Sequence, residues 1–173
     1  MLQSIITAVQ PWADYYADHR VVSTAIIAGH LLAMFVGGGI AVATDRQILR
    51  VPANRPDLAQ AAAADMESTH RVVITALVLV ILSGALLFLS EVETFAVSPV
   101  YWAKMSGVVL LLLNGLRMQR AERAVVGGHG VVTPETAAVP FPSTAWGTLT
   151  TTARVSVVLW LAILLLGVVL TNV

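Results

Sequence analysis

The sequence predicts an all-α integral membrane protein, a four-helix bundle of two transmembrane hairpins. Of its 173 residues, 57% are hydrophobic and only 12% are charged, whereas soluble domains carry about 25% charged residues. Four apolar stretches approach the roughly 20 residues that cross a bilayer core about 30 Å thick. The composition excludes an ordinary soluble enzyme, and the zero net charge gives no support for a nucleic-acid partner. The lipid bilayer is the expected environment.

The first 20 residues are expected to form an interfacial segment, and residues 21–173 the four-span transmembrane domain. Residues 1–10 lack the basic region and the small-residue cleavage site of a secretory signal. We therefore expect a short helix along the membrane surface, ending at the break made by Pro11 and Trp12.

The membrane spans are expected at residues 21–44, 72–90, 98–116 and 155–173. The third span contains Lys104, but it begins with a helix-start signal. Ser98 is a suitable N-cap and Pro99 a suitable first helical residue, which places Lys104 in the second turn, near the interface.

Two polar side chains within the third span are candidate site residues. Lys104 is expected either to extend outward and pair with Glu91 or Glu93, or to face a polar cavity as an anion or proton group. Asn114, near the other end of the span, is expected to hydrogen-bond between helices.

The basic residues predict the orientation of the spans. Eight of the ten Lys and Arg residues fall in the two connections that share one side of the membrane: Arg46, Arg50, Arg55, Arg71, Arg117, Arg120, Arg123 and Arg154. Such residues are retained in the cytoplasm. Both termini are therefore expected on the outer side of the membrane, which we expect to be a bacterial inner (plasma) membrane. Trp and Tyr residues on that outer side would form an aromatic belt.

The two basic connections are predicted to differ. Residues 57–71 are rich in alanine, a strong helix former, so the second membrane helix should begin after Pro56, before it enters the bilayer. The other connection should stay helical through Arg123 and then become a Gly- and Pro-rich loop. Its apolar part, including Trp146, would lie along the interface or cover the cytoplasmic mouth of the bundle.

A stripe of small residues in the first span indicates close helix packing, within the bundle or in a homo-oligomer. Its members recur every four residues: Ala25, Gly29, Ala33, Gly37 and Ala41. His30 lies beside the stripe and is expected to point inward near the midplane, where an unpaired polar group is costly.

Three interpretations of His30 stay open at this point. It is a neutral histidine bonded to a hydroxyl or carbonyl group, an axial ligand of haem b, or part of a proton or metal relay. His70 is the natural second haem ligand. However, even if both helices extend to the turn between them, counting from residue 53 leaves the two histidines about 9 Å apart in depth.

Glu67 and His70 form a Glu-x-x-His pattern that puts a carboxylate and an imidazole on one helix face. With Asp65 they are weak candidates for a metal site, because carboxylate-bridged sites need two such motifs. The absence of cysteine excludes thiolate metal sites and disulfides.

Several short motifs carry a family resemblance: His30-Leu31-Leu32 followed by glycines, Gly84-Ala85-Leu86-Leu87-Phe88, and the stretch from Ser98 to Lys104 with Asn114 beyond it. Over about residues 21–123 the chain resembles a family of uncharacterised bacterial four-helix inner-membrane proteins, distantly similar to the copper-resistance-D and cytochrome b561-like membrane families. The cytochrome-like relatives imply haem b on His30, with His70 as a second candidate; the copper-resistance relatives imply metal handling.

The leading functional hypothesis is a haem-b-binding or redox-associated membrane subunit. The alternatives are a non-enzymatic scaffold or accessory subunit of a membrane complex, and a small transporter or metal-handling protein that uses His30, Lys104 and the face of Glu67 and His70. No serine, histidine and carboxylate are arranged for hydrolysis. Whether the chain is an enzyme stays open.

Overall fold

The computed structural model describes residues 2–52, 55–127 and 143–170, and these ranges are almost entirely helical. The helices in chain order are α1 (Leu2–Asp18), α2 (Arg20–Arg50), α3 (Pro56–Ser90), α4 (Val92–Val97), α5 (Pro99–Gly127) and α6 (Ser143–Leu170). Helices α2, α3, α5 and α6 are long and apolar enough to cross a membrane. The predicted class, an all-α integral membrane protein, is confirmed at this level.

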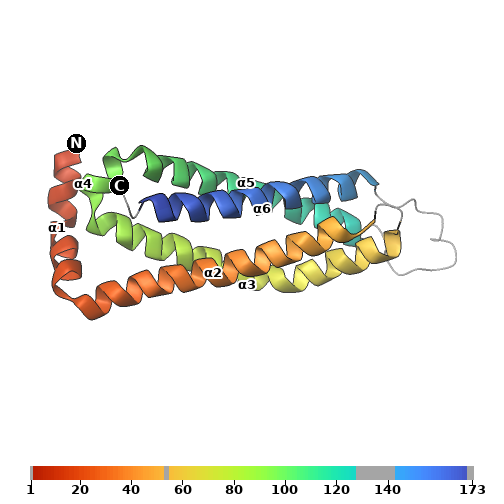
Figure 1. The fold of residues 1–173 in the computed structure, drawn as a ribbon, viewed down its shortest axis with the longest axis horizontal. Helices are drawn as coiled ribbons and strands as arrows, with labels where there is room; N and C mark the ends of the chain where they lie inside the picture. Colours follow the sequence, from red (N-terminus) through yellow and green to blue (C-terminus); the bar gives the residue numbers. More distant parts are fainter. Residues whose placement is uncertain (1, 53–54, 128–142, 171–173) are drawn as a thin grey trace.

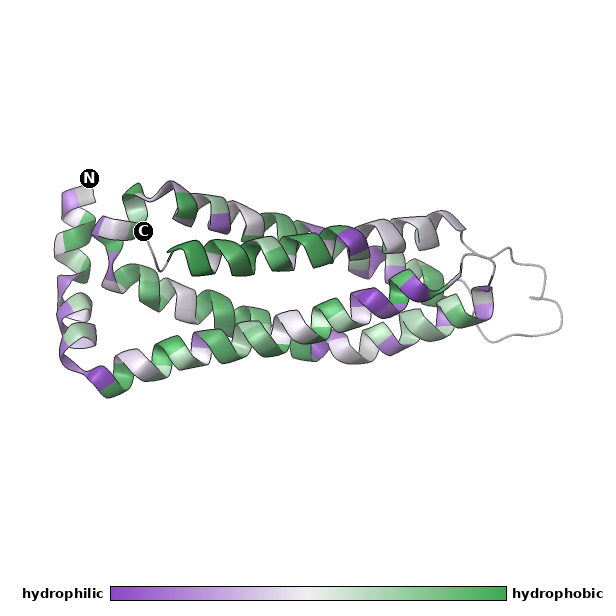
Figure 2. Ribbon diagram, in the orientation of Figure 1, coloured by the Kyte–Doolittle hydropathy of each residue, from purple (hydrophilic) through white to green (hydrophobic). Residues whose placement is uncertain are grey.

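The long helices pack in two pairs, α2 with α3 and α5 with α6, and contacts between α2 and α6 join the pairs. Helix α1 lies across one end of the bundle, beside α4 (Figure 1). We call this end the α4 end and the opposite one the distal end. At 35 residues, α3 is about 52 Å long, well beyond a bilayer core of about 30 Å. Hydrophilic residues gather on the distal halves of the helices (Figure 2).

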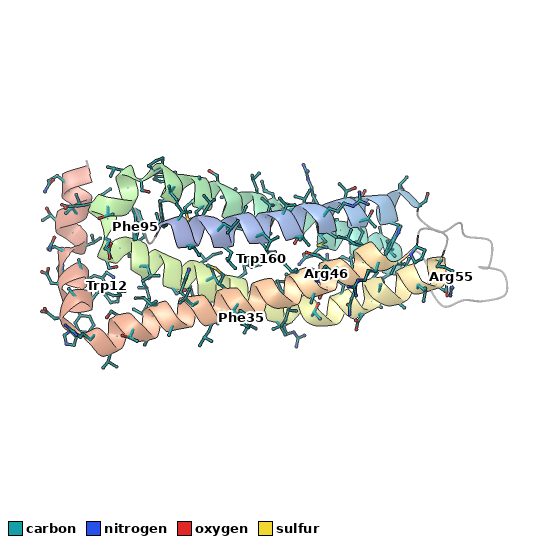
Figure 3. The ribbon with its side chains drawn as sticks, in the orientation of Figure 1. Trp12, Phe35, Arg46, Arg55, Phe95 and Trp160 are labelled. Carbon is teal, nitrogen blue, oxygen red and sulfur yellow. The ribbon has the colours of Figure 1, made fainter. Side chains whose placement is uncertain are left out.

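The outward faces of the long helices are apolar, as expected of surfaces that contact lipid. Phe35 on α2 is 79% exposed (Figure 3), and exposed leucines and valines follow on all four helices. In water such surfaces would be unfavourable, whereas in lipid they carry no such cost.

Two helix boundaries bear on the predictions for the connections. Helix α3 begins at Pro56, as the alanine-rich sequence predicts. Helix α6 begins at Ser143, twelve residues before the expected start of the fourth span at residue 155. Trp146 therefore belongs to a helix and not to the loop in which it was expected, whether along the interface or over the mouth of the bundle. Its burial in the bundle stabilises these extra turns, because packing can outweigh local propensity. The predicted Gly- and Pro-rich loop, residues 128–142, lies outside the described residues.

Helix α1 continues through Pro11, so the predicted end of the helix at Pro11 and Trp12 is wrong. Proline removes one backbone hydrogen bond from the helix, but docking compensates: the indole Nε1 of Trp12 donates to the carbonyl of Leu86 on α3 at 3.0 Å. Tyr16, also on α1, is partly buried and lies near the carboxylate of Glu91. Burial and this negative charge both raise the pKa of its hydroxyl. Helix α1 is thus held against the α4 end.

Aromatic side chains gather at the α4 end, as an aromatic belt requires. The ring of Tyr101 stacks on Phe88 at 5.0 Å and on Phe95 at 5.6 Å, between ring centroids, and meets Trp102 edge-on. The indole Nε1 of Trp102 donates to the carbonyl of Ala96 at 3.0 Å. These contacts tie α3, α4 and α5 together.

The small-residue stripe of α2 is used only in part. A Cβ atom added at Gly37 would lie 2.7 Å from the Cβ of Ala76, so α2 and α3 approach closely there. A Cβ atom added at the neighbouring Gly38 would lie 2.9 Å from the indole ring of Trp160 on α6, so these two helices also approach closely. Gly29 has nothing within 4 Å and Ala25 is exposed. The close packing is therefore confined to the middle of the helix.

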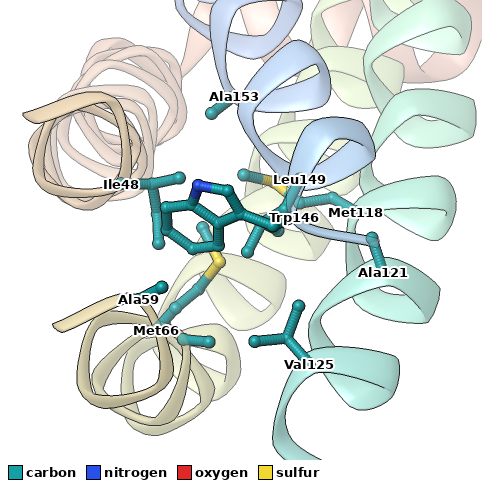
Figure 4. Close-up of a cluster of buried hydrophobic side chains, with 10 residues drawn as sticks. Ile48, Ala59, Met66, Met118, Ala121, Val125, Trp146, Leu149 and Ala153 are labelled. Atoms are coloured by element: carbon teal, nitrogen blue, oxygen red, sulfur yellow. The ribbon is translucent and has the colours of Figure 1, made fainter. Parts of the chain in front are cut away.

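An apolar core closes the distal end of the bundle. Trp146 lies among side chains from all four long helices (Figure 4), which are Ile48, Ala59, Ala63, Met66, Met118, Ala121, Val125, Leu149 and Ala153. A second cluster, Val108, Leu111, Trp160 and Ile163, lies nearer the α4 end. Between the two clusters the helices carry polar side chains.

Candidate functional site: a buried polar layer

Among the residues that the structure describes, the most buried acidic or basic side chain is that of Asp45 on α2, which is only 2% exposed. The hydroxyl of Ser156 on α6 donates a hydrogen bond to its carboxylate. Its other oxygen, Oδ2, has no hydrogen-bond partner among the described residues. A buried carboxylate oxygen without a partner is costly, and protonation removes much of that cost.

A histidine–carboxylate pair joins α3 and α5 in the same part of the bundle. Nδ1 of His70 lies 3.1 Å from Oε2 of Glu122, and the side chains are 22% and 5% exposed. Asp45 also interacts electrostatically with His70. Three titratable side chains from three helices are thus brought near one another, and Ser156 adds the fourth helix.

Uncharged polar groups complete this layer. The amide Nδ2 of Asn114 donates to the carbonyl of Thr152 on α6 at 2.9 Å in a buried bond, which is the interhelical role expected for Asn114. The hydroxyl groups of Thr44 on α2 and Thr69 on α3 lie 3.5 Å apart. We call Asp45, His70, Glu122, Asn114 and Ser156 the polar layer.

The structure places the predicted site residue His30 in a different part of the bundle. It is buried, and its Nδ1 lies 2.8 Å from the hydroxyl of Ser83 on α3. Gly84 leaves room for the ring, because an added Cβ would sit 3.4 Å from its Cε1. Because Ser83 follows His70 by 13 residues on the same helix, the two histidines lie about 20 Å apart along the bundle. A haem ligated by both does not fit this arrangement.

Lys104 lies in the α4 half of the bundle, partly buried. An added Cβ at Gly167 on α6 would lie 3.6 Å from its Nζ, so the ammonium group packs against the backbone of α6. Among the described residues it forms no ion pair with Glu91 or Glu93. The expected role as an anion or proton group in a polar cavity stays a prediction.

The Glu-x-x-His pattern acquires a different partner in the structure. His70 pairs with Glu122 across the α3–α5 contact, and the side chain of Glu67 lies outside the described residues. No group of three His, Cys, Asp or Glu side chains that could hold a metal ion occurs in the described part of the chain.

Asp45, Glu122 and Ser156 are absent from the candidates identified in the sequence, yet two of them carry a recognisable signal. Asp45 is the next member of the four-residue spacing that runs through Gly37 and Ala41. Glu122 follows Asn114 and Met118 at the same spacing, on the inward face of α5. Extending each inward stripe beyond the apolar run would have found both carboxylates.

The four-helix architecture alone selects no function, because bundles host cofactors, transport pathways and scaffolds alike. The function therefore has to be argued from the residues of the site. In comparisons with known proteins, neither a protein family nor a curated protein nor a solved structure matches this chain.

Proposed function

We propose that this integral membrane protein transfers protons, as a small transporter whose polar layer takes up and releases them. The observation that carries the proposal is Asp45, almost fully buried and with one carboxylate oxygen unpartnered among the described residues. Ionisable residues inside a membrane bundle are expensive and are typical of proton pathways.

The geometry around Asp45 supports a relay. Its carboxylate accepts a hydrogen bond from Ser156 and interacts with His70, which pairs with Glu122 at 3.1 Å. An imidazole that pairs with one carboxyl group and lies near a second can pass a proton between them through its two ring nitrogens. His70 is partly exposed, so it connects this buried cluster with the surface at the distal end.

Proton flux in proteoliposomes tests the proposal. A potassium gradient with valinomycin makes the vesicle interior negative, and a trapped pH-sensitive dye records proton entry. We expect flux above that of empty vesicles, and we expect Asp45→Asn and Glu122→Gln to lower it roughly tenfold or more. Glu93→Gln removes an exposed carboxylate at the α4 end and should leave the flux unchanged.

The stability of Asp45→Asn separates proton transfer from a purely structural role. The amide has nearly the same shape and removes a buried charge, so the variant should unfold at the same or higher denaturant concentration than the wild-type protein. Wild-type flux in this variant, or an equal loss in Glu93→Gln, would exclude the relay. A protein without flux that co-purifies with partners would favour the scaffold function.

A second candidate, binding of haem b by His30, is favoured by one contact. The hydrogen bond between Nδ1 and Ser83 is the kind that orients a ligating imidazole. His30 would be the single protein ligand identified, and a bound haem would supply one-electron transfer. Visible spectra of the oxidised and dithionite-reduced protein test this: a Soret band lost in His30→Ala supports the assignment, and a colourless wild-type protein contradicts it.

A further inference from the structure

A groove of about 570 Å³ opens between α3 and α5 beside the polar layer. Arg71 and Ile74 line it from α3, Arg123 and Val126 line it from α5, and His70 and Glu122 of the polar layer also contribute to its lining. Both walls are amphipathic, because each helix places one guanidinium group near an aliphatic side chain. Such a surface suits an amphipathic ligand.

The charge of the groove is positive at its surface. Arg71 and Arg123 are exposed, and neither forms an ion pair with a described carboxylate. The carboxylate of Glu122, which shares the groove's lining, belongs to a side chain that is 5% exposed and pairs with His70. Two exposed guanidinium groups in one groove, without a carboxylate partner in the described part of the chain, fit the oxygens of a phosphate group, which arginine binds with paired hydrogen bonds.

An apolar track leads from the groove toward the α4 end. Ile74, Val78 and Leu82 follow one another every four residues on α3 and are 45%, 49% and 58% exposed. Residues four apart lie on one helix face, so the three form a continuous strip that starts at Ile74 in the groove. Arg71 directly precedes the apolar run that begins at Val72, which places the groove at the level of the lipid headgroups.

We propose that this groove binds an anionic phospholipid, with its phosphate between Arg71 and Arg123 and an acyl chain along Ile74, Val78 and Leu82. Basic pockets between membrane helices bind anionic headgroups in this way. The apolar strip favours a lipid over a free phosphate ion, which would leave the strip unused. The assignment rests on the exposed arginines and the apolar strip, whereas proton transfer rests on Asp45 and on the His70–Glu122 pair that also lines the groove; lipid binding and proton flux are therefore measured separately.

Native mass spectrometry of the detergent-purified protein tests the site. The protein is titrated with phosphatidylglycerol, with phosphatidylcholine and, in a separate arm, with inorganic phosphate. We expect retention of phosphatidylglycerol in preference to phosphatidylcholine. The double variant Arg71→Gln/Arg123→Gln should bind phosphatidylglycerol with an affinity lowered at least about tenfold. The matched control Arg46→Gln/Arg50→Gln removes two exposed arginines of α2 and should bind as the wild-type protein does.

Both double variants should keep the wild-type thermal unfolding midpoint, because all four arginine side chains are exposed. Equal binding of the two lipids would overturn the proposal. So would an equal loss of binding in the two double variants, or wild-type binding in Arg71→Gln/Arg123→Gln. Tight binding of inorganic phosphate that displaces the lipid would assign the groove to a free anion instead.

Discussion

Three consecutive glycines in α2 allow a matched test of how closely the helices pack. An alanine Cβ would meet the Cβ of Ala76 at 2.7 Å at Gly37, the indole of Trp160 at 2.9 Å at Gly38, and nothing within 4 Å at Gly39. Ordinary van der Waals contact begins at about 3.4 Å. The Cβ of Ala76 is fixed to its backbone, so α2 and α3 must separate by several tenths of an ångström to admit Gly37→Ala.

The expected free energies follow from two opposing terms. Glycine to alanine in a helix interior gains up to about 1 kcal/mol, whereas overpacking costs about 1–3 kcal/mol. We therefore expect Gly39→Ala to be neutral or stabilising and Gly37→Ala to lower the free energy of unfolding by about 1–2 kcal/mol. Gly38→Ala should fall between them, because the Trp160 ring can tilt slightly although it is buried.

Reversible unfolding of the purified protein by SDS titration in mixed micelles, followed by circular dichroism, measures the three variants under identical conditions. Because the glycines are adjacent, they share the same helix, depth and chemical change. Equal stabilities of Gly37→Ala and Gly39→Ala would refute the close contact between α2 and α3 at Ala76.

Three further substitutions probe individual contacts. Trp146→Ala should lower the free energy of unfolding by about 3–5 kcal/mol, measured by the same SDS titration, because it empties the centre of the distal core; a loss below about 1 kcal/mol would contradict that packing. Ser83→Ala removes the partner of His30 and should cost about 0.5–1.5 kcal/mol, with no effect expected when His30 is already alanine. Trp12→Phe removes the donor to the carbonyl of Leu86 and should speed amide hydrogen exchange in α1 without changing the unfolding of the bundle; unchanged exchange would show that the bond does not hold α1.

The membrane-spanning helices could be predicted from the sequence because that prediction depends on local properties. An apolar run of about 20 residues must satisfy its backbone within itself in lipid, so it forms a helix whatever its neighbours are. The alanine-rich start of α3 after Pro56 was predictable for a similar reason, since alanine favours helix without tertiary help.

The start of α6 and the partner of His70 depended on packing between segments far apart in the chain. Trp146 belongs to a helix because side chains from α2, α3 and α5 surround it. His70 has a carboxylate three residues earlier in sequence, Glu67, but it pairs with Glu122, 52 residues later.

The helical class, the four apolar spans and the inward position of His30 could be predicted from composition and residue spacing. Helix packing is what brings Asp45, His70 and Glu122 into one layer, about 20 Å from His30. The physical reason is that helix formation and membrane insertion depend on composition over a single segment. Which polar groups meet depends instead on the rotation and relative depth of helices that are packed side by side.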